Sequence, residues 1–206
     1  MAKKKKKNPF VLITVIVLIV AALAVTGVLL FMKKDDPQVP NNTVQEPVSV
    51  NDPYSIRSNA TDYQKELYED LQNALESDDQ QAVLENVAKN FVADFFTLSN
   101  KSIKNDIGGT QFWSSDARIV LRNKAIDTFY TNLELYIDDY GSENLPTVNS
   151  VIVEDFYQSL DDSNVYIVCV SWTYEENSVF DTSDFQKYAV ISVTTLEETP
   201  YVFSIY

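Results

Sequence analysis

The chain has 206 residues, a formal net charge of −14, one cysteine and no histidine. One cysteine excludes an internal disulfide, and the lack of histidine excludes Ser-His-Asp triads, Cys-His dyads and histidine-ligated zinc. Eight bases and 26 acids follow residue 57, so this part of the chain carries a formal charge of −18. That charge disfavours contact with nucleic acid and favours solubility and cationic partners.

An apolar segment at residues 10–32 reads FVLITVIVLIVAALAVTGVLLFM and contains no charged residue. As a helix rising about 1.5 Å per residue, it would be roughly 35 Å long, enough to cross a hydrocarbon core of about 30 Å. Five lysines at 3–7 precede it and two at 33–34 follow it. We therefore predict a basic cytoplasmic tail at residues 1–9, a single membrane span, and a C-terminal region outside the cell membrane, with the lipid bilayer as a partner.

A cleaved signal peptide is the alternative reading of this segment, because Ala22-Leu23-Ala24 resembles a small-residue cleavage site. The apolar run continues to Met32, eight residues beyond that site. A signal-peptide core of about 7–15 residues does not require this extension, which favours an uncleaved signal anchor. No cysteine follows the span closely, which excludes a lipoprotein anchor.

Residues 33–60 contain four prolines and show neither helical nor strand periodicity. Prolines at this spacing are incompatible with a helix interior. We predict a proline-rich linker of roughly 30 Å as a flexible coil, followed by an extracytoplasmic domain at residues 61–206.

The domain is predicted to begin with two helices. Thr61 or Asp62 is the candidate N-cap of the first, which ends near Ser77. The second runs from Asp78-Asp79 to about Leu98, and its wide aromatic face is typical of a central core helix.

A third helix is predicted from Ser115 or Asp116 to Tyr140, followed by Gly141 as its C-terminal cap. Its buried stripe is expected to comprise Ile119, Ala125, Ile126, Phe129, Tyr130, Leu133, Tyr136, Ile137 and Tyr140.

The hydrophobic period then changes from 3.6 to 2, which predicts four strands in an antiparallel meander. Their expected ranges are 148–160, 165–174, 185–196 and 201–206. Cys169 lies within the second strand and is expected to be a buried, inert thiol. The fold class is therefore α+β, with three helices packed on one face of a curved four-stranded antiparallel sheet.

This order of helix, helix, glycine-containing loop, helix and four strands resembles the cone-shaped fold of nuclear transport factor 2-like domains. It is most similar to the variant found in extracytoplasmic domains of conjugation and type IV secretion proteins, including the TcpC family of Gram-positive conjugation systems. The resemblance implies a short cytoplasmic tail, one span, a linker and such a domain, with a pocket between sheet and helices. It covers the element order of the whole chain and assigns no role to any residue.

The loop SNKSIKNDIGGTQFW at residues 99–113 breaks the helical pattern and is long for a compact domain. A short strand is expected at 110–113, and the alternative to a binding role is a simple connection with a buried Phe112–Trp113 pair. The candidate partner-binding residues in this loop are Lys101, Lys104, Gly108, Gly109, Phe112 and Trp113.

Three other kinds of site have weaker support. An isomerase-like enzyme would need a carboxylate in an apolar pocket with a raised pKa, and Asp127 and Asp155 are the candidates, each with a surface position as the alternative. The acid pairs at 138–139, 161–162, 175–176 and 197–198 lack the spacing of a calcium loop, so no metal or cofactor is expected. The aromatic side chains at 166, 172 and 174 fit core packing better than a binding face.

We therefore expect a membrane-anchored, non-catalytic binding or assembly module, with envelope proteins or further copies of itself as partners. A conjugation or secretion channel scaffold is the specific version of this hypothesis. The alternative is a small-molecule-binding or isomerase-like domain that uses an aromatic cavity. A cavity filled by phenylalanine and leucine favours the first hypothesis, and an open pocket around a carboxylate of raised pKa favours the second.

Overall fold

The computed structural model describes residues 54–77, 79–115, 117–195 and 199–206. The predicted tail, membrane span and most of the predicted linker lie outside the described residues. Within those ranges, no helix combines the length and apolar character needed to cross a bilayer.

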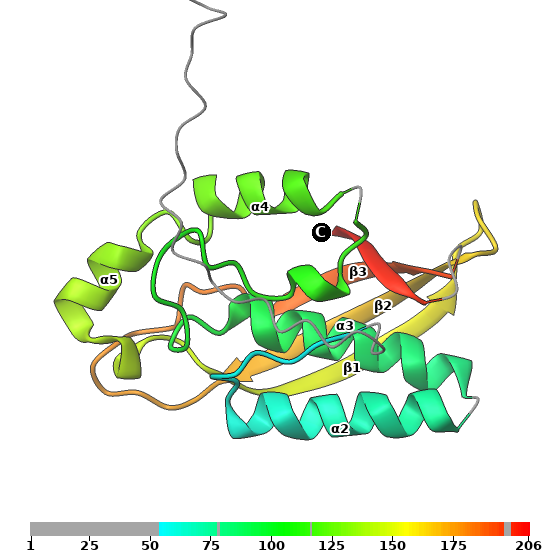
Figure 1. The fold of residues 1–206 in the computed structure, drawn as a ribbon, viewed down its shortest axis with the longest axis horizontal. Helices are drawn as coiled ribbons and strands as arrows, with labels where there is room; N and C mark the ends of the chain where they lie inside the picture. The colour runs from blue at the N-terminus through cyan, green and yellow to red at the C-terminus, as the bar shows by residue number, and fades with distance from the viewer. Residues whose placement is uncertain (1–53, 78, 116, 196–198) are drawn as a thin grey trace, which may run out of the picture. The chain divides into compact units, whose positions relative to one another are not determined.

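The described residues form an α+β domain whose four strands pair antiparallel in the order β1-β2-β3-β4 (Figure 1). This confirms the predicted class and meander. The elements are α2 (Asp62–Glu76), α3 (Gln80–Phe96), the 3-10 helix η1 (Thr110–Phe112), α4 (Arg118–Asp127), α5 (Leu133–Tyr140), the 3-10 helix η2 (Ser142–Asn144), β1 (Val148–Gln158), β2 (Val165–Tyr174), β3 (Tyr188–Thr194) and β4 (Tyr201–Ile205).

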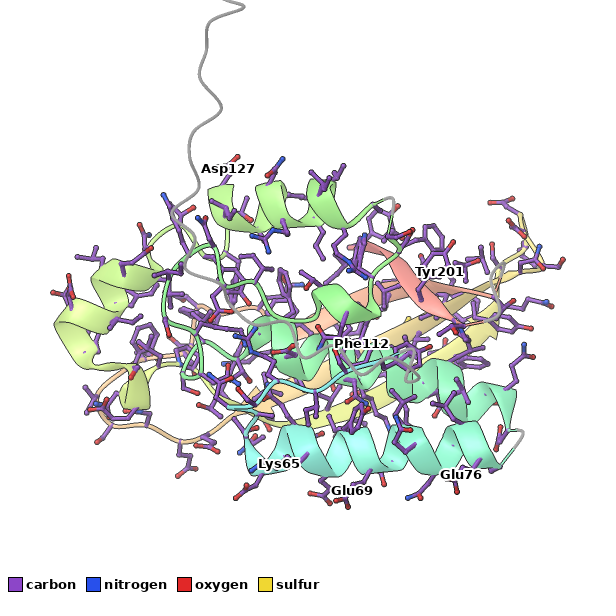
Figure 2. All side chains as sticks on the ribbon, viewed as in Figure 1. Lys65, Glu69, Glu76, Phe112, Asp127 and Tyr201 are labelled. Carbon is purple, nitrogen blue, oxygen red and sulfur yellow. The ribbon has the colours of Figure 1, made fainter. Side chains whose placement is uncertain are left out.

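Helix α3 forms the centre of the domain, as its wide aromatic face predicted. It contacts all four strands and also α2 and η1 (Figure 1). Eleven of its 17 residues are buried, whereas α2 keeps a polar outer side that carries Lys65, Glu69 and Glu76 (Figure 2). The alternating residues of β2 behave as expected, with Val168, Val170, Trp172 and Tyr174 in the core.

The start of α2 is fixed by a capping box. The Gln64 N–H donates to Thr61 Oγ1 (3.2 Å), and the Thr61 N–H donates to Gln64 Oε1 (2.9 Å). Two backbone donors that helix geometry leaves unpaired are thereby satisfied.

Replacing Thr61 with alanine is expected to lower the free energy of unfolding by about 1 kcal/mol, because it removes one half of the capping box. Thr61→Ser keeps the hydroxyl and should lose less than half of that amount. Urea unfolding of both variants, followed by tryptophan fluorescence, measures the difference. Equal losses in the two variants would contradict a capping role.

The prediction of one helix from residue 116 to Tyr140 is wrong, because the chain forms two helices with a break between them. The hydroxyls of Thr128 and Thr131 donate to carbonyls in the last turn of α4 (2.7 and 2.8 Å), and Thr128 leaves helical dihedrals. Tyr130 is fully buried and donates its hydroxyl to the Phe95 carbonyl (2.6 Å). The break places Tyr130 in the core.

Two members of the predicted stripe are consequently exposed, Ile119 on α4 and Tyr140 on α5, while Ala125, Tyr130 and Leu133 are buried. The expected strand at 110–113 is also wrong. Gly109 adopts a left-handed conformation and starts η1, and only Trp113 joins the sheet, through an isolated parallel bridge to Val202.

Candidate functional site

The predicted binding loop folds back over α3, and most of its candidate residues lie inside the domain. The side chain of Lys101 is fully buried, as is the ring of Phe112. Trp113, Gly108 and Gly109 are also buried, while Lys104 is exposed. Among these candidates, only Lys104 places its side chain at the surface.

Both glycines permit the loop to approach α3 closely. A Cβ on Gly108 would lie 2.1 Å from the backbone oxygen of Asp94, far inside van der Waals contact. Gly109 has φ of +75°, and a Cβ there would lie 2.7 Å from the ring of Phe91. Gly108 thus allows the loop backbone to approach α3 closely, and Gly109 allows a positive φ.

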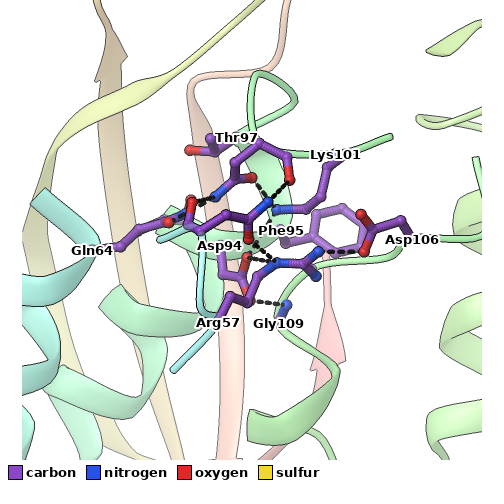
Figure 3. A network of polar contacts seen from close by, with 12 residues as sticks. Arg57, Gln64, Asp94, Phe95, Thr97, Lys101, Asp106 and Gly109 are labelled. Carbon is purple, nitrogen blue, oxygen red and sulfur yellow. Dashed lines mark hydrogen bonds and ion pairs between the residues drawn. The ribbon is translucent and has the colours of Figure 1, made fainter. Parts of the chain in front are cut away.

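Asp94 of α3 is the centre of a buried polar cluster (Figure 3). Its carboxylate accepts hydrogen bonds from Lys101 Nζ (2.9 Å), the Gly109 N–H (2.8 Å) and Gln111 Nε2 (3.0 Å). Arg57 Nε lies 4.0 Å from the same carboxylate. One side chain of α3 therefore holds both the loop at residues 99–113 and the segment that precedes α2.

Arg57 connects this cluster to a second acid, because its guanidinium forms an ion pair and hydrogen bond with Asp106. Asp106 in turn accepts from the Ser102 N–H (3.3 Å). Two cations, Arg57 and Lys101, thus face two anions, Asp94 and Asp106. The cluster is neutral as a whole, so each buried charge has a partner of opposite sign, and removing one partner would leave a buried charge unpaired.

The ionisation of Asp94 follows from these contacts. Burial raises the pKa of Asp94, but Lys101 and Arg57, with the hydrogen bonds of Gln111 and Gly109, outweigh burial and hold the pKa below its usual value. Asp94 is therefore an ionised structural anion, and it lacks the raised pKa of a carboxylic acid catalyst.

Tyr130 also binds the loop at residues 99–113. Its hydroxyl accepts from the Gly108 N–H (3.2 Å) while donating to the Phe95 carbonyl. Burial is the main cause that raises the pKa of Tyr130 well above its usual value. Tyr130 therefore acts as a neutral hydrogen-bonding bridge between α3 and the loop.

A shallow notch of about 10 Å³ lies beside the polar cluster, lined in part by Arg57, Gln64, Asp94 and Gln111. That volume holds about one water molecule. The notch is therefore too small for an organic substrate.

Aromatic side chains fill the space between α3, the helices after it and the sheet. Phe96 packs against Trp172 with ring centroids 4.3 Å apart, and Phe95 contacts Phe129 at 5.8 Å and Tyr130 at 5.6 Å. Trp172 and Tyr174 of β2 are buried, as the core-packing interpretation predicted.

The two carboxylates considered for catalysis are both at the surface. Asp127 is the last residue of α4 and Asp155 lies in β1, and both are exposed. In the described ranges, no three His, Cys, Asp or Glu side chains are placed to hold a metal ion together.

The sheet presents a second face that the helices do not cover. Strand pairing brings Ile152, Ser171 and Tyr188 into one row of this face, and Tyr157 and Ile167 into another. Ile152, Tyr157 and Tyr188 are 56%, 48% and 50% exposed. We call Ile152, Tyr157, Ile167, Tyr188 and Val190 the outer sheet face. The row between the two holds Asp155, Cys169 and Val190. Large apolar side chains exposed on one face of a sheet are typical of interaction surfaces.

Both edges of the sheet are partly occupied. On β1, the Val151 N–H donates to the Tyr63 hydroxyl (2.7 Å) and the Val148 N–H to Thr97 Oγ1 (3.1 Å). On β4, the Val202 carbonyl accepts from the Ser114 N–H (3.1 Å). Occupied edges disfavour the addition of a further strand, so the outer sheet face is the more accessible surface of the sheet.

Residues before the predicted domain boundary at 61 also belong to this architecture. Tyr54 is 1% exposed, stacks on Phe112 with ring centroids 5.5 Å apart, and donates its hydroxyl to the Pro200 carbonyl. Arg57 lies in the polar cluster described above. The domain therefore includes the residues from Tyr54 onward, seven residues before the predicted boundary.

Sequence reasoning missed Arg57, Asp94, Asp106, Gln111 and Tyr130 as members of one cluster. The sequence contains one signal for a buried polar cluster. Asn90 and Asp94 are the two polar residues of the segment NFVADFF in α3, which is otherwise apolar, and both are buried. Asn90 donates to the Leu67 carbonyl (2.9 Å) and joins α3 to α2.

Comparisons of the chain with protein-family models, with curated proteins and with solved structures find no match.

Proposed function

We propose that this protein is a single-pass membrane protein whose C-terminal domain is a non-catalytic binding or assembly module outside the cell membrane. The apolar segment at residues 10–32 and the lysines before it support the anchor and its orientation. A scaffold of a conjugation or secretion channel is the specific form of this proposal, and the resemblance in element order supports it.

The observation that carries the binding role is the outer sheet face. It combines exposed tyrosine and isoleucine side chains on a rigid sheet, and tyrosine is enriched at protein interfaces. By contrast, aromatic side chains fill the interior, and the buried Asp94 has a lowered pKa. These features favour a surface that binds protein over a cavity that binds a small molecule.

The charges on this face indicate the chemistry of the partner. Glu154 accepts a hydrogen bond from Ser171 on the outer sheet face, and Asp155 pairs with Cys169. The four strands contain no lysine or arginine. We infer that the partner is an envelope protein that presents basic and apolar side chains, because complementary charges direct association.

The junction between linker and domain suits a tether. Tyr54 is locked between Phe112 and the Pro200 carbonyl, so the chain joins the domain through a fixed contact. A linker of this length raises the effective concentration of the domain for partners close to the membrane.

The topology can be tested in cells that produce the full-length chain. We expect the protein to stay in the membrane pellet after carbonate extraction and its C-terminal domain to be digested by protease added outside spheroplasts. Recovery in the carbonate supernatant, or protection from external protease, would contradict the proposal.

The binding face can be tested in the same cells with a photoreactive amino acid at Tyr188 and, as a control, at the exposed Glu69 of α2 (Figure 2). We expect a discrete crosslinked product from position 188 only. Reversing the charge of Glu154 and Asp155 with lysine should reduce that product at least fivefold. A product with the mass of two copies would assign the face to self-association, and equal products from positions 188 and 69 would refute a specific surface.

A further inference from the structure

Residues 54–60, which precede α2, form neither helix nor strand and lie against the domain. We call them the strap. Tyr54 at its start is buried, stacks on Phe112 and donates its hydroxyl to the Pro200 carbonyl. The Tyr54 carbonyl accepts a hydrogen bond from the Tyr68 hydroxyl (3.0 Å). Each of these contacts involves a tyrosine side chain, so the strap is bound in the way that a short peptide ligand is bound.

Arg57 is the second anchor of the strap. Its guanidinium binds Asp106 and lies 4.0 Å from Asp94 (Figure 3), and the side chains of these two acids are 6% and 7% exposed. Of the cations that the structure places in this cluster, only Lys101 would remain if the strap left, and a buried carboxylate without a partner is costly. We call the residues that hold the strap the strap site, namely Tyr68, Asp94, Asp106 and Phe112. The strap site therefore requires a guanidinium, whichever copy of the chain supplies it.

A tight turn joins the strap to α2. The Ala60 N–H donates to the Arg57 carbonyl (3.1 Å), and Asn59 Nδ2 donates to the Asn100 carbonyl (2.7 Å). Asn59 is exposed. The hydrogen bonds of the capping box begin only at Thr61, whose dihedrals are extended (φ −65°, ψ 164°). Opening this turn would therefore turn the strap away from its own domain and leave the cap of α2 in place.

The sequence of the strap indicates what else fits the strap site. The chain contains three arginines, and only Arg57 has an aromatic residue three positions before it, Tyr54. Arg118 and Arg122 follow Ser115 and Ile119 at that spacing. No other segment of the sequence thus supplies an aromatic ring and a guanidinium at the distance that the strap site binds. A second copy of the chain supplies both.

We propose that the strap of one copy occupies the strap site of a second copy, and the reverse, so that two copies are joined by the exchange of residues 54–60. This inference rests on the proposed membrane anchor, because copies held in one bilayer reach a local concentration that competes with closure within one chain. The exchanged contacts are those of the closed chain, and such an exchange is a low-cost route to a dimer. Each copy contributes Tyr54 and Arg57 to the site of its partner.

The test uses the full-length chain in the membranes of cells that produce it, with Cys169→Ala in every variant. Ile56 of the strap and Gln111 of η1 line the same notch, so cysteines at these positions lie close enough for a short thiol crosslinker. Two differently tagged copies are produced together, one with Ile56→Cys and the other with Gln111→Cys. The matched control replaces Ile56→Cys with Glu69→Cys on the exposed side of α2. A single chain with cysteines at 56 and 111 reports the closed strap.

We expect a crosslinked product that carries both tags, at least fivefold more abundant from position 56 than from position 69. Arg57→Gln in the copy that carries Ile56→Cys should lower this product at least threefold, because the donated strap loses its guanidinium. The same substitution in the copy that carries Gln111→Cys should raise the product, because it weakens the hold of that copy's own strap and leaves its carboxylates in need of a cation.

Equal products from positions 56 and 69 would overturn the exchange, and so would an equal effect of Arg57→Gln in the two copies. If the chain with both cysteines crosslinks within itself and no product carries both tags, the strap stays closed and the proposal is wrong. If that chain does not crosslink at all, the strap does not occupy the strap site, which also overturns it.

Carbonate extraction of the same membranes separates this inference from the proposed anchor. A chain that stays in the washed membranes without a two-tag product defeats the exchange alone. A chain that carbonate removes, also without that product, defeats the anchor and the exchange together. A two-tag product from a chain that carbonate removes defeats the anchor and supports the exchange.

Discussion

Replacing Lys101 with methionine is expected to lower the free energy of unfolding by about 3–5 kcal/mol, because it leaves a buried carboxylate without its closest cation. Lys101 Nζ lies 2.9 Å from Asp94 Oδ1, and both side chains are buried. Methionine keeps most of the aliphatic stem, so the loss reports mainly the charge. Trp113 and Trp172, the two tryptophans of the chain, are buried and report unfolding in urea by fluorescence.

Lys65→Met is the matched control. Lys65 also pairs with an aspartate at 2.8 Å, but its partner Asp62 lies at the surface of α2. Exposed pairs contribute little to stability, so no measurable change is expected. Similar losses for Lys65→Met and Lys101→Met would show that the buried cluster has no special role.

Lys101→Met should also change the acid stability of the protein. Because the pKa of Asp94 is lowered on folding, the folded state binds fewer protons than the unfolded state at low pH. The resulting stabilisation is complete above the unfolded pKa of about 3.9 and is lost as the pH falls through the lower folded value. Lys101→Met removes one of the two cations that lower this pKa. The acid unfolding transition is therefore expected to move to higher pH, which unfolding curves between pH 3 and 7 would detect.

The elements that the sequence predicts well are those with local signals. The helical period and caps of α2 and α3 and the alternation in β2 predict their bounds to within a few residues. Ser, Thr or Asp at a helix start and alternating apolar residues in a strand are properties of neighbouring positions. Such signals need no knowledge of the rest of the fold.

The helix break and the polar cluster depend on contacts far apart in sequence. The predicted helical stripe is interrupted at Tyr130, because its hydroxyl donates to the Phe95 carbonyl, 35 residues away. Lys101 was predicted to be a partner-binding residue of the loop, and a lysine in a polar loop is usually solvated. Its burial follows from Asp94 of α3, which pairs with Lys101 and also lies 4.0 Å from Arg57 of the segment before α2. No pattern among neighbouring residues predicts that these three side chains lie together.

Replacing Gly108 with alanine is expected to destabilise the domain by about 3 kcal/mol, the upper part of the range for overpacking. The new Cβ would lie 2.1 Å from the Asp94 backbone oxygen, and a helix backbone has no side-chain rotamer that relieves the clash. Gly141→Ala is the control. Gly141 has φ of +79° and ψ of 143°, but its nearest neighbour is the flexible end of Glu143, so only the backbone cost of this positive-φ conformation, about 1–3 kcal/mol, remains.

The clash at Gly108 also predicts a coupling with the polar cluster. Relief of the clash requires the loop to move away from α3, and that movement would withdraw the Gly109 N–H and Lys101 from Asp94. Gly108→Ala and Lys101→Met therefore remove overlapping interactions. The double variant should lose less stability than the sum of the single losses, by more than about 0.5 kcal/mol. Strict additivity in urea unfolding would show that the glycine contact and the ion pair are independent, and that the loop is held to α3 at two separate points.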